Sequence, residues 1–197
     1  MRIILTFFSC LLVLSLVGQS TKMAAFTKVE LDGPVEVELV AGKERKVEVL
    51  READMVMWEV NSETLVVVAN HRDEREIVKM RITVTDLEVL ETTGSVVVTG
   101  KGEFASATLE LNIHGQSAVS MDVDAMSLYI DANYQSVLTL TGTADRMNVT
   151  ADRQSVVNTT GLTSTQIKAT ADRQSVVKLN RSGAEVEAES KRQSVVN

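Results

Sequence analysis

The chain has 197 residues, which is enough for one domain with a sizeable core. Its formal net charge is −7 at pH 7, and an acidic surface argues against nucleic acids and anionic lipids as partners. The chain has one cysteine, Cys10, and two histidines, His71 and His114, which are about 43 residues apart. These few groups argue against thiol chemistry and cysteine-based zinc sites, so we expect no metal and no cofactor.

The first 20 residues have the pattern of a secretory signal peptide. Arg2 is their only charged residue, residues 3–17 are mainly apolar, and the small residues Gly18 and Ser20 follow. An apolar run of about 15 residues is shorter than the roughly 20 that a membrane-spanning helix needs. No second stretch is long enough, so we expect no membrane span in the mature chain. An exported chain without further cysteines suits a bacterial envelope, and we expect it in the periplasm, on the outer-membrane surface or outside the cell.

Residues 26–90 are typical of β-strands. Residues 35–39, Val-Glu-Val-Glu-Leu, alternate strictly between apolar and charged side chains, which indicates a half-buried strand. Asp32, Gly33 and Pro34 mark a turn just before it. We expect residues 21–197 to form a single β-helix domain, in which residues 26–90 make wider coils or a cap and residues 91–197 make regular repeats.

The repeats are the most informative part of the sequence. Residues 151–157, Ala-Asp-Arg-Gln-Ser-Val-Val, return at residues 171–177, and shorter copies occur before and after them. The serines of the motif stand at positions 95, 117, 136, 155, 175 and 194, so their spacings are 22, 19, 19, 20 and 19 residues. A fixed period of this length, rich in valine and threonine, predicts an all-β fold: a single-stranded parallel β-helix, or solenoid, with coils of about 19–20 residues.

Alignment of the repeats predicts which side chains face the core. In the second strand of each coil three apolar columns recur at every second residue, and we expect them to point inward. These columns are Leu109, Leu128, Met147, Ile167 and Val186, then Leu111, Ile130, Val149, Ala169 and Ala188, then Ile113, Ala132, Ala151, Ala171 and Ser190. In most coils a Thr-Gly pair, such as Thr141 and Gly142, predicts a turn between the two strands.

The first strand of each coil leaves two alternatives open. Two valine-rich columns stand side by side, one aligned with Val96 and Val137 and the other with Val97 and Leu138. Strict alternation sends one of them outward, which would give an exposed valine stripe and a contact surface. If the serine marks a corner instead, both columns could turn inward.

These features resemble a family of bacterial exported proteins, the putative auto-transporter adhesin, head GIN domain family. The resemblance rests on the signal peptide, on the strands at residues 29–37, 47–49 and 82–84, and on the repeats of about 20 residues. It covers residues 26–197 and implies a single-stranded β-helix of the cell envelope. The chain departs from the family where later repeats have Gln-Ser-Val in place of a Gly-Ser-Gly element. The resemblance supplies no catalytic residues.

Charged side chains recur just before the serine in the last three repeats. The candidate ligand-binding residues are Asp152, Arg153, Asp172, Arg173, Arg192 and Tyr134. Stacked coils would place Asp beside Asp and Arg beside Arg about 5 Å away, with diagonal pairing between them. Such a ladder is either a solvated product of repeat duplication or part of a glycan-binding or catalytic site. For the neighbouring glutamine and serine columns we expect hydrogen bonds along the axis.

The sequence therefore favours a non-catalytic envelope or cell-surface protein, a scaffold or adhesin-like module that binds a protein or a glycan. The alternative is a β-helix enzyme that acts on polysaccharides, which would need a concave groove with converging Asp, Arg and Tyr side chains. We further expect self-association end to end through the C-terminal coil, because an uncovered solenoid end exposes unpaired backbone groups.

Overall fold

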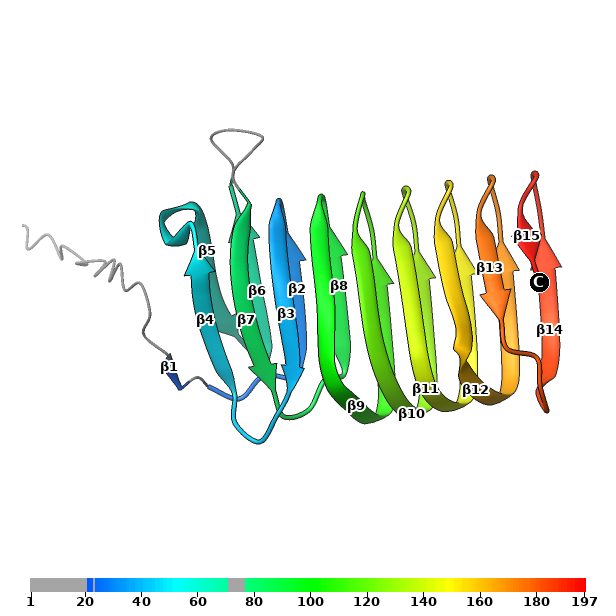
Figure 1. Cartoon of the computed structure of the whole chain (residues 1–197), viewed down its shortest axis with the longest axis horizontal. Helices are drawn as coiled ribbons and strands as arrows, with labels where there is room; N and C mark the ends of the chain where they lie inside the picture. The colour runs from blue at the N-terminus through cyan, green and yellow to red at the C-terminus, as the bar shows by residue number, and fades with distance from the viewer. Residues whose placement is uncertain (1–20, 23, 71–76) are drawn as a thin grey trace, which may run out of the picture.

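The computed structural model describes residues 21–22, 24–70 and 77–197. Residues 1–20, where we predict the signal peptide, and His71 lie outside the described residues. One sheet of fifteen strands winds into a solenoid, which confirms the predicted all-β parallel β-helix (Figure 1). The only helical turn described is a 3-10 turn at Ala53–Met55. No helix among the described residues is long and apolar enough to cross a membrane.

The strands fall into a short set before the repeats and a long set within them. The first set is β1 (Thr21–Lys22), β2 (Lys28–Asp32), β3 (Val35–Ala41), β4 (Lys46–Arg51), β5 (Val56–Asn61), β6 (Thr64–Ala69), β7 (Val78–Val84) and β8 (Val89–Thr93). The second is β9 (Val96–Ile113), β10 (Ala118–Ala132), β11 (Val137–Ala151), β12 (Val156–Ala171), β13 (Val176–Leu179), β14 (Glu185–Ser190) and β15 (Val195–Val196).

Each long strand bends and so belongs to both faces of the solenoid. The first halves of β9 to β12 stack with β3 on one side and β13 and β15 on the other, and we call this sheet the first face. The second halves stack with β8 and β14 and form the second face. We predicted a turn between the two halves; this was wrong for β9, β11 and β12, whereas Ser182 and Gly183 do form the predicted turn between β13 and β14. Pairing runs through Gly142, which lies beside Val123 and Leu162, because the strand bends at bulges and glycines without leaving the sheet.

The inward columns of the second face are confirmed from β9 to β12, whereas in β14 Val186 is half-buried and Ala188 and Ser190 are exposed. Leu128 lies beside Leu109 and Met147, and Met147 lies beside Ile167. Their side chains belong to one core cluster that extends from Phe26 to Leu179. Burial of each Leu, Ile or Val contributes roughly 1.5–3 kcal/mol, so these columns supply much of the stability of the repeats.

The coils before the repeats do not follow the order of the sequence. β2 pairs in parallel with both β6 and β8, and β3 pairs with both β7 and β9. The first coil in the sequence is therefore third in the stack, inserted between the coil of β6 and β7 and the coil of β8 and β9 (Figure 1). Beyond the coil of β6 and β7, β4 and β5 run antiparallel to β7 and β6, and the short β1 pairs with β4. Trp58 of β5 is half-buried and packs against the core.

The structure corrects our alignment of the first repeat. We aligned Ser95 with Ser117, but Ala118 of β10 lies beside Val97, not Val96. Val96 therefore stands in the serine column, where it is fully buried, and Ser95 is exposed. The valine column with Ala118 begins at Val97, one residue later than predicted. Our alignment matched the serines, whereas the structure buries the apolar Val96 at the position of the serine.

Candidate binding face

The turns between the end of one long strand and the start of the next, which we call the corners, have an unusual backbone. In four successive coils two adjacent residues at the corner have positive φ, as in a type I′ turn, a conformation that favours glycine. The pairs are Tyr134 and Gln135, Arg153 and Gln154, Arg173 and Gln174, and Arg192 and Gln193. The left-handed conformation costs a side-chain-bearing residue about 1–2 kcal/mol, and earlier corners have glycine at this point, as at Gly94 and Gly115. The later corners therefore carry larger side chains at a cost in stability.

Buried serines hold these corners together. Ser117, Ser136, Ser155 and Ser175 are at most 1% exposed. Ser155 donates to the carbonyl oxygen of Asp152 at 2.7 Å, and Ser136 donates to the hydroxyl of Ser155 at 3.2 Å. The serine column is therefore structural, as predicted for it.

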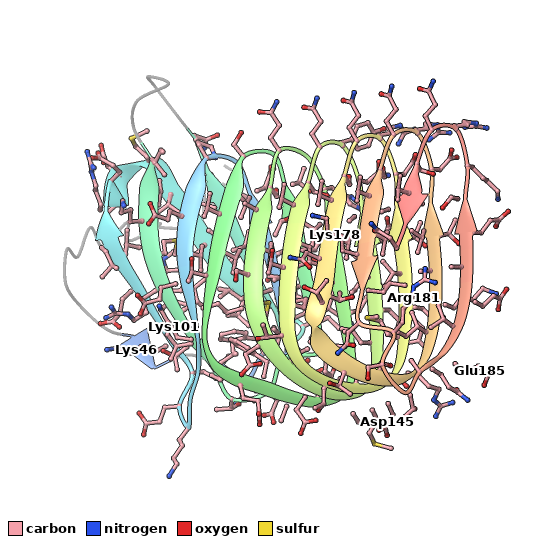
Figure 2. The ribbon with its side chains drawn as sticks, turned by 45° about the vertical axis from the view of Figure 1, so that its right-hand side comes forward. Lys46, Lys101, Asp145, Lys178, Arg181 and Glu185 are labelled. Atoms are coloured by element: carbon pink, nitrogen blue, oxygen red, sulfur yellow. The ribbon has the colours of Figure 1, made fainter. Side chains whose placement is uncertain are left out.

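The glutamine side chains form a continuous ladder along the axis, which confirms the predicted stacking of amides. Each Nε2 donates to the Oε1 of the glutamine in the next coil, and Figure 2 shows this edge as a row of evenly spaced side chains. The N···O distances are 3.3 Å from Gln116 to Gln135, 3.1 Å from Gln135 to Gln154, 3.1 Å from Gln154 to Gln174 and 3.3 Å from Gln174 to Gln193. All five side chains are exposed.

The structure brings the six candidate binding residues onto this corner edge, where they pair with one another. Arg173 donates to Asp152, and Arg192 lies 3.3 Å from the carboxylate of Asp172, in each case one coil back. Asp152 and Asp172 also accept the backbone N–H of Arg153 and Arg173, both at 2.8 Å. The diagonal pairing that the sequence predicts is therefore present, and the charges of the ladder largely cancel.

In the coil before Asp152, Asn133 and Tyr134 stand at the positions of the aspartate and the arginine. Arg153 donates to the side-chain oxygen of Asn133 at 3.2 Å, and its guanidinium stands 4.3 Å from the centre of the Tyr134 ring. A cation over an aromatic face is attractive, so this contact fixes the ring. Tyr134 remains 52% exposed beside the glutamine ladder.

One valine column of the first face points outward, which settles the alternatives that the sequence left open. Val97 and Val137 are each 45% exposed, whereas Val98 and Leu138, the next residues along, are at most 1% exposed. The outward column is Val97, Ala118, Val137, Val156, Val176 and Val195. Two residues further along each strand comes an outward column of small polar side chains: Thr99, Ser120, Thr139 and Asn158. Strict alternation was the sequence signal for this arrangement.

These columns make a flat surface without charged side chains, which we call the valine face. It consists of Val97, Ala118, Val137 and Val156, of Thr99, Ser120, Thr139 and Asn158, and of the amides of Gln116, Gln135 and Gln154 at its corner edge. Recesses in the surface lie elsewhere, one beside Leu87 and Phe104 and another beside Asn148 and Lys168.

Charged residues surround the valine face. On the side of β3 and β7, Lys79 pairs with Glu36 at 2.7 Å and Arg81 pairs with Glu38 at 2.8 Å. The hydrogen bond to Glu38 and the charge of that carboxylate raise the pKa of the Arg81 guanidinium. On the opposite side Lys178 of β13 lies beside Asn158 (Figure 2). Where the strands bend, Asp122 accepts a hydrogen bond from Thr141 at 2.8 Å.

The histidine and the corner carboxylates in the described part of the chain do not form a common cluster. His114 is half-buried at a corner, and its Nε2 is buried without a hydrogen-bond partner. No group of three or more His, Cys, Asp or Glu side chains that could hold a metal ion occurs in residues 21–22, 24–70 and 77–197. The carboxylates of Asp152 and Asp172 are engaged with guanidinium and turn N–H groups.

The fold and this face define a parallel β-solenoid with a flat, repetitive surface. The chain belongs to the putative auto-transporter adhesin, head GIN domain family, whose sequence pattern matches residues 25–196. A comparison with the sequences of curated proteins found no match.

Several solved structures have a similar fold. A putative adhesin from Bacteroides fragilis is 13% identical with a TM-score of 0.78, over 90% of this chain and 93% of that one. A putative lipid-binding protein from Parabacteroides distasonis is 13% identical with a TM-score of 0.65, over 91% and 94%. A putative adhesin from the same species is 13% identical with a TM-score of 0.61, over 90% and 94%. At this identity the likeness shows the fold alone.

Proposed function

We propose that the protein is a non-catalytic binding module of the cell envelope, exported by the signal peptide in residues 1–20, and that it binds its partner through the valine face. The observation that carries this proposal is the outward valine column, which presents a small aliphatic side chain on each successive coil. A contiguous exposed apolar surface on a folded protein commonly marks an interaction site.

The surroundings of the face support this proposal. Polar side chains rim the apolar stripe, and the charges of the neighbouring ladder are already paired, so the face is ready to contact a partner without breaking ion pairs. The adhesin descriptions of the family and of two similar structures agree with a binding role. End-to-end self-association through β14 and β15 stays a prediction, and sedimentation of the purified protein tests it.

Two double variants with the same charge change test the proposal. Val137→Lys with Val156→Lys places two lysines on the valine face, on β11 and β12. Thr150→Lys with Thr170→Lys places two lysines on the second face of the same two strands. We expect labelled wild-type protein and the threonine variant to bind equally to cell envelopes isolated from the source organism. The valine variant should bind at least about tenfold more weakly, a loss of about 1.4 kcal/mol. Equal binding by both variants would contradict the proposal that the protein binds through the valine face.

A further inference from the structure

We propose that the ligand of the valine face is an uncharged, extended polysaccharide whose chain lies along the solenoid axis, with successive sugars on successive coils. This inference rests on the proposed function and adds the chemical class of the partner. Four features of the face support it: amide groups with free hydrogen-bonding capacity, an aliphatic stripe, the absence of charged side chains among its residues, and its size.

The glutamine ladder retains hydrogen-bonding capacity toward solvent. A primary amide has two N–H donors and an oxygen with two lone pairs. Within the ladder Gln135 and Gln154 each use one N–H toward the next coil and one lone pair toward the previous coil. Each exposed amide therefore keeps one donor and one acceptor. Adjacent hydroxyl groups of a sugar can engage such a donor–acceptor pair together, and the ladder repeats the pair on every coil.

The valine column supplies the apolar half of the contact. A pyranose ring has C–H groups on its faces and hydroxyl groups around its edge. A sugar that lays one ring face on Val137 or Val156 places its edge hydroxyls between the glutamine amides on one side and Thr139 or Asn158 on the other. The exposed ring of Tyr134 stands at the same corner as Gln135 and offers a further apolar contact.

The charges around the face favour a neutral ligand over an acidic one. Arg173 and Arg192 pair with Asp152 and Asp172, and Arg153 is held by Asn133 and Tyr134. An acidic sugar would have to break these pairs or leave its own carboxylate without a partner, and both are unfavourable. At the rim Glu36 pairs with Lys79, and Lys178 carries a positive charge beside Asn158. The repulsion of an anionic polymer therefore comes from the net charge of −7.

The size of the face suits a narrow chain. Three spacings of about 4.8 Å between the four strands, and four residue steps of about 3.3 Å from the glutamine column to the threonine column, span roughly 14 Å by 13 Å, or about 190 Å². A stable protein–protein interface takes about 800 Å² from each partner. The face is therefore smaller than a protein partner requires, yet long enough for several sugars in a row.

The corner backbone is an independent sign that the glutamines are retained for binding. Gln135 and Gln154 have φ values of 67° at positions that favour glycine. Strained backbone of this kind accumulates at functional sites, where it positions a side chain. Glycine would relieve the strain and remove the amides, so replacement by glycine separates binding from folding.

Chemical treatment of the envelopes tests the ligand class. Periodate cleaves sugars at adjacent hydroxyl groups, and protease removes proteins. We expect periodate treatment to abolish binding of the wild-type protein and protease treatment to leave it unchanged. Polysaccharides extracted from the envelopes and separated by anion exchange should compete only when they come from the uncharged fraction. Loss of binding after protease, or competition by the acidic fraction alone, would overturn the inference while leaving the proposed function in place.

A variant of the ladder completes the test. Gln135→Gly with Gln154→Gly should bind envelopes and the neutral fraction at least about tenfold more weakly than wild type, with an unchanged or higher Tm. The Thr150→Lys and Thr170→Lys variant provides the control for nonspecific loss. Wild-type affinity in the glycine variant would show that the amides do not contact the ligand and would overturn the inference. If wild-type protein does not bind envelopes at all, the proposed function fails, and that outcome is distinct from a failure of the ligand class alone.

Discussion

Arg173 donates to the carboxylate of Asp152, which lies one coil back, while the N–H of Arg173 donates to Asp172, its neighbour in the chain. Each aspartate thus accepts a hydrogen bond from the backbone of its own corner and pairs with the guanidinium of the next coil. This diagonal arrangement lets like charges stack along the axis, because every guanidinium lies near a carboxylate or an amide oxygen. It also leaves the ladder with little free charge for a ligand.

The charge of this ladder should add little to stability. In Asp152→Asn with Asp172→Asn the side-chain oxygen that accepts the corner N–H remains, and only the carboxylate charge is lost. Exposed ion pairs contribute about 0.2–1 kcal/mol each, so we expect Tm to fall by only a few degrees. Differential scanning calorimetry in low and high salt measures the effect. A fall of more than about 10 °C would mean that the ladder is a structural ion site.

The inward columns should carry the stability instead. Val149 is 3% exposed, so Val149→Asp buries an unpaired charge at a cost of several kcal/mol and should unfold the repeats. Its exposed neighbour provides a matched control, and Thr150→Asp should remain folded. Circular dichroism during thermal melting distinguishes the two. Similar melting curves for both variants would contradict the assignment of faces.

The strain at the corners predicts opposite effects for two substitutions at one site. Gln154 has a φ of 67°, so glycine relieves the left-handed conformation, and a β-branched residue makes it worse. We expect Gln154→Gly to unfold at the same or higher urea concentration than wild type, and Gln154→Val to be less stable by at least about 1 kcal/mol. Equal stability of the two variants would show that the corner is not strained.

The inserted coil should be as important to the core as the repeats are. Leu39 of β3 is fully buried between β7 and β9, so Leu39→Ala should cost about 2–5 kcal/mol. Leu50 of β4 is 53% exposed, and Leu50→Ala should change stability by less than about 0.5 kcal/mol. Chemical denaturation compares the two variants. A small effect at Leu39 would contradict the placement of β3 inside the stack.

The sequence predicted the buried residues correctly where two periods in it agree. In the second strand, alternation at every second residue and repetition every 19–20 residues fix the same inward set, and Leu128 lies beside Met147 as expected. It failed by one residue at the first repeat, where the serine match outweighed the burial of Val96. The order of β2, β6 and β8 in the stack was beyond prediction, because residues 26–90 have no internal repeat that would show which strands pair.

The candidate site was predicted in part. The glutamine ladder and the diagonal Asp–Arg pairs followed from repetition, since equivalent residues must stack in a parallel solenoid. The left-handed conformation of Arg153 and Gln154 could not be foreseen, because neither residue type favours it. The valine face was only one of two alternatives, because the sequence alone does not show where the corner bends.

Protection of a thiol on the valine face tests the central claim most directly. A protein lacking residues 1–20 contains no cysteine, so Val137→Cys and Thr150→Cys each introduce a single thiol, on opposite faces of β11. Both positions are exposed, and a thiol-reactive probe should label both at similar rates in the free protein. With envelopes added, we predict labelling at residue 137 to slow about tenfold and labelling at residue 150 to stay unchanged. Unchanged labelling at residue 137 in protein that has bound the envelope would contradict the account.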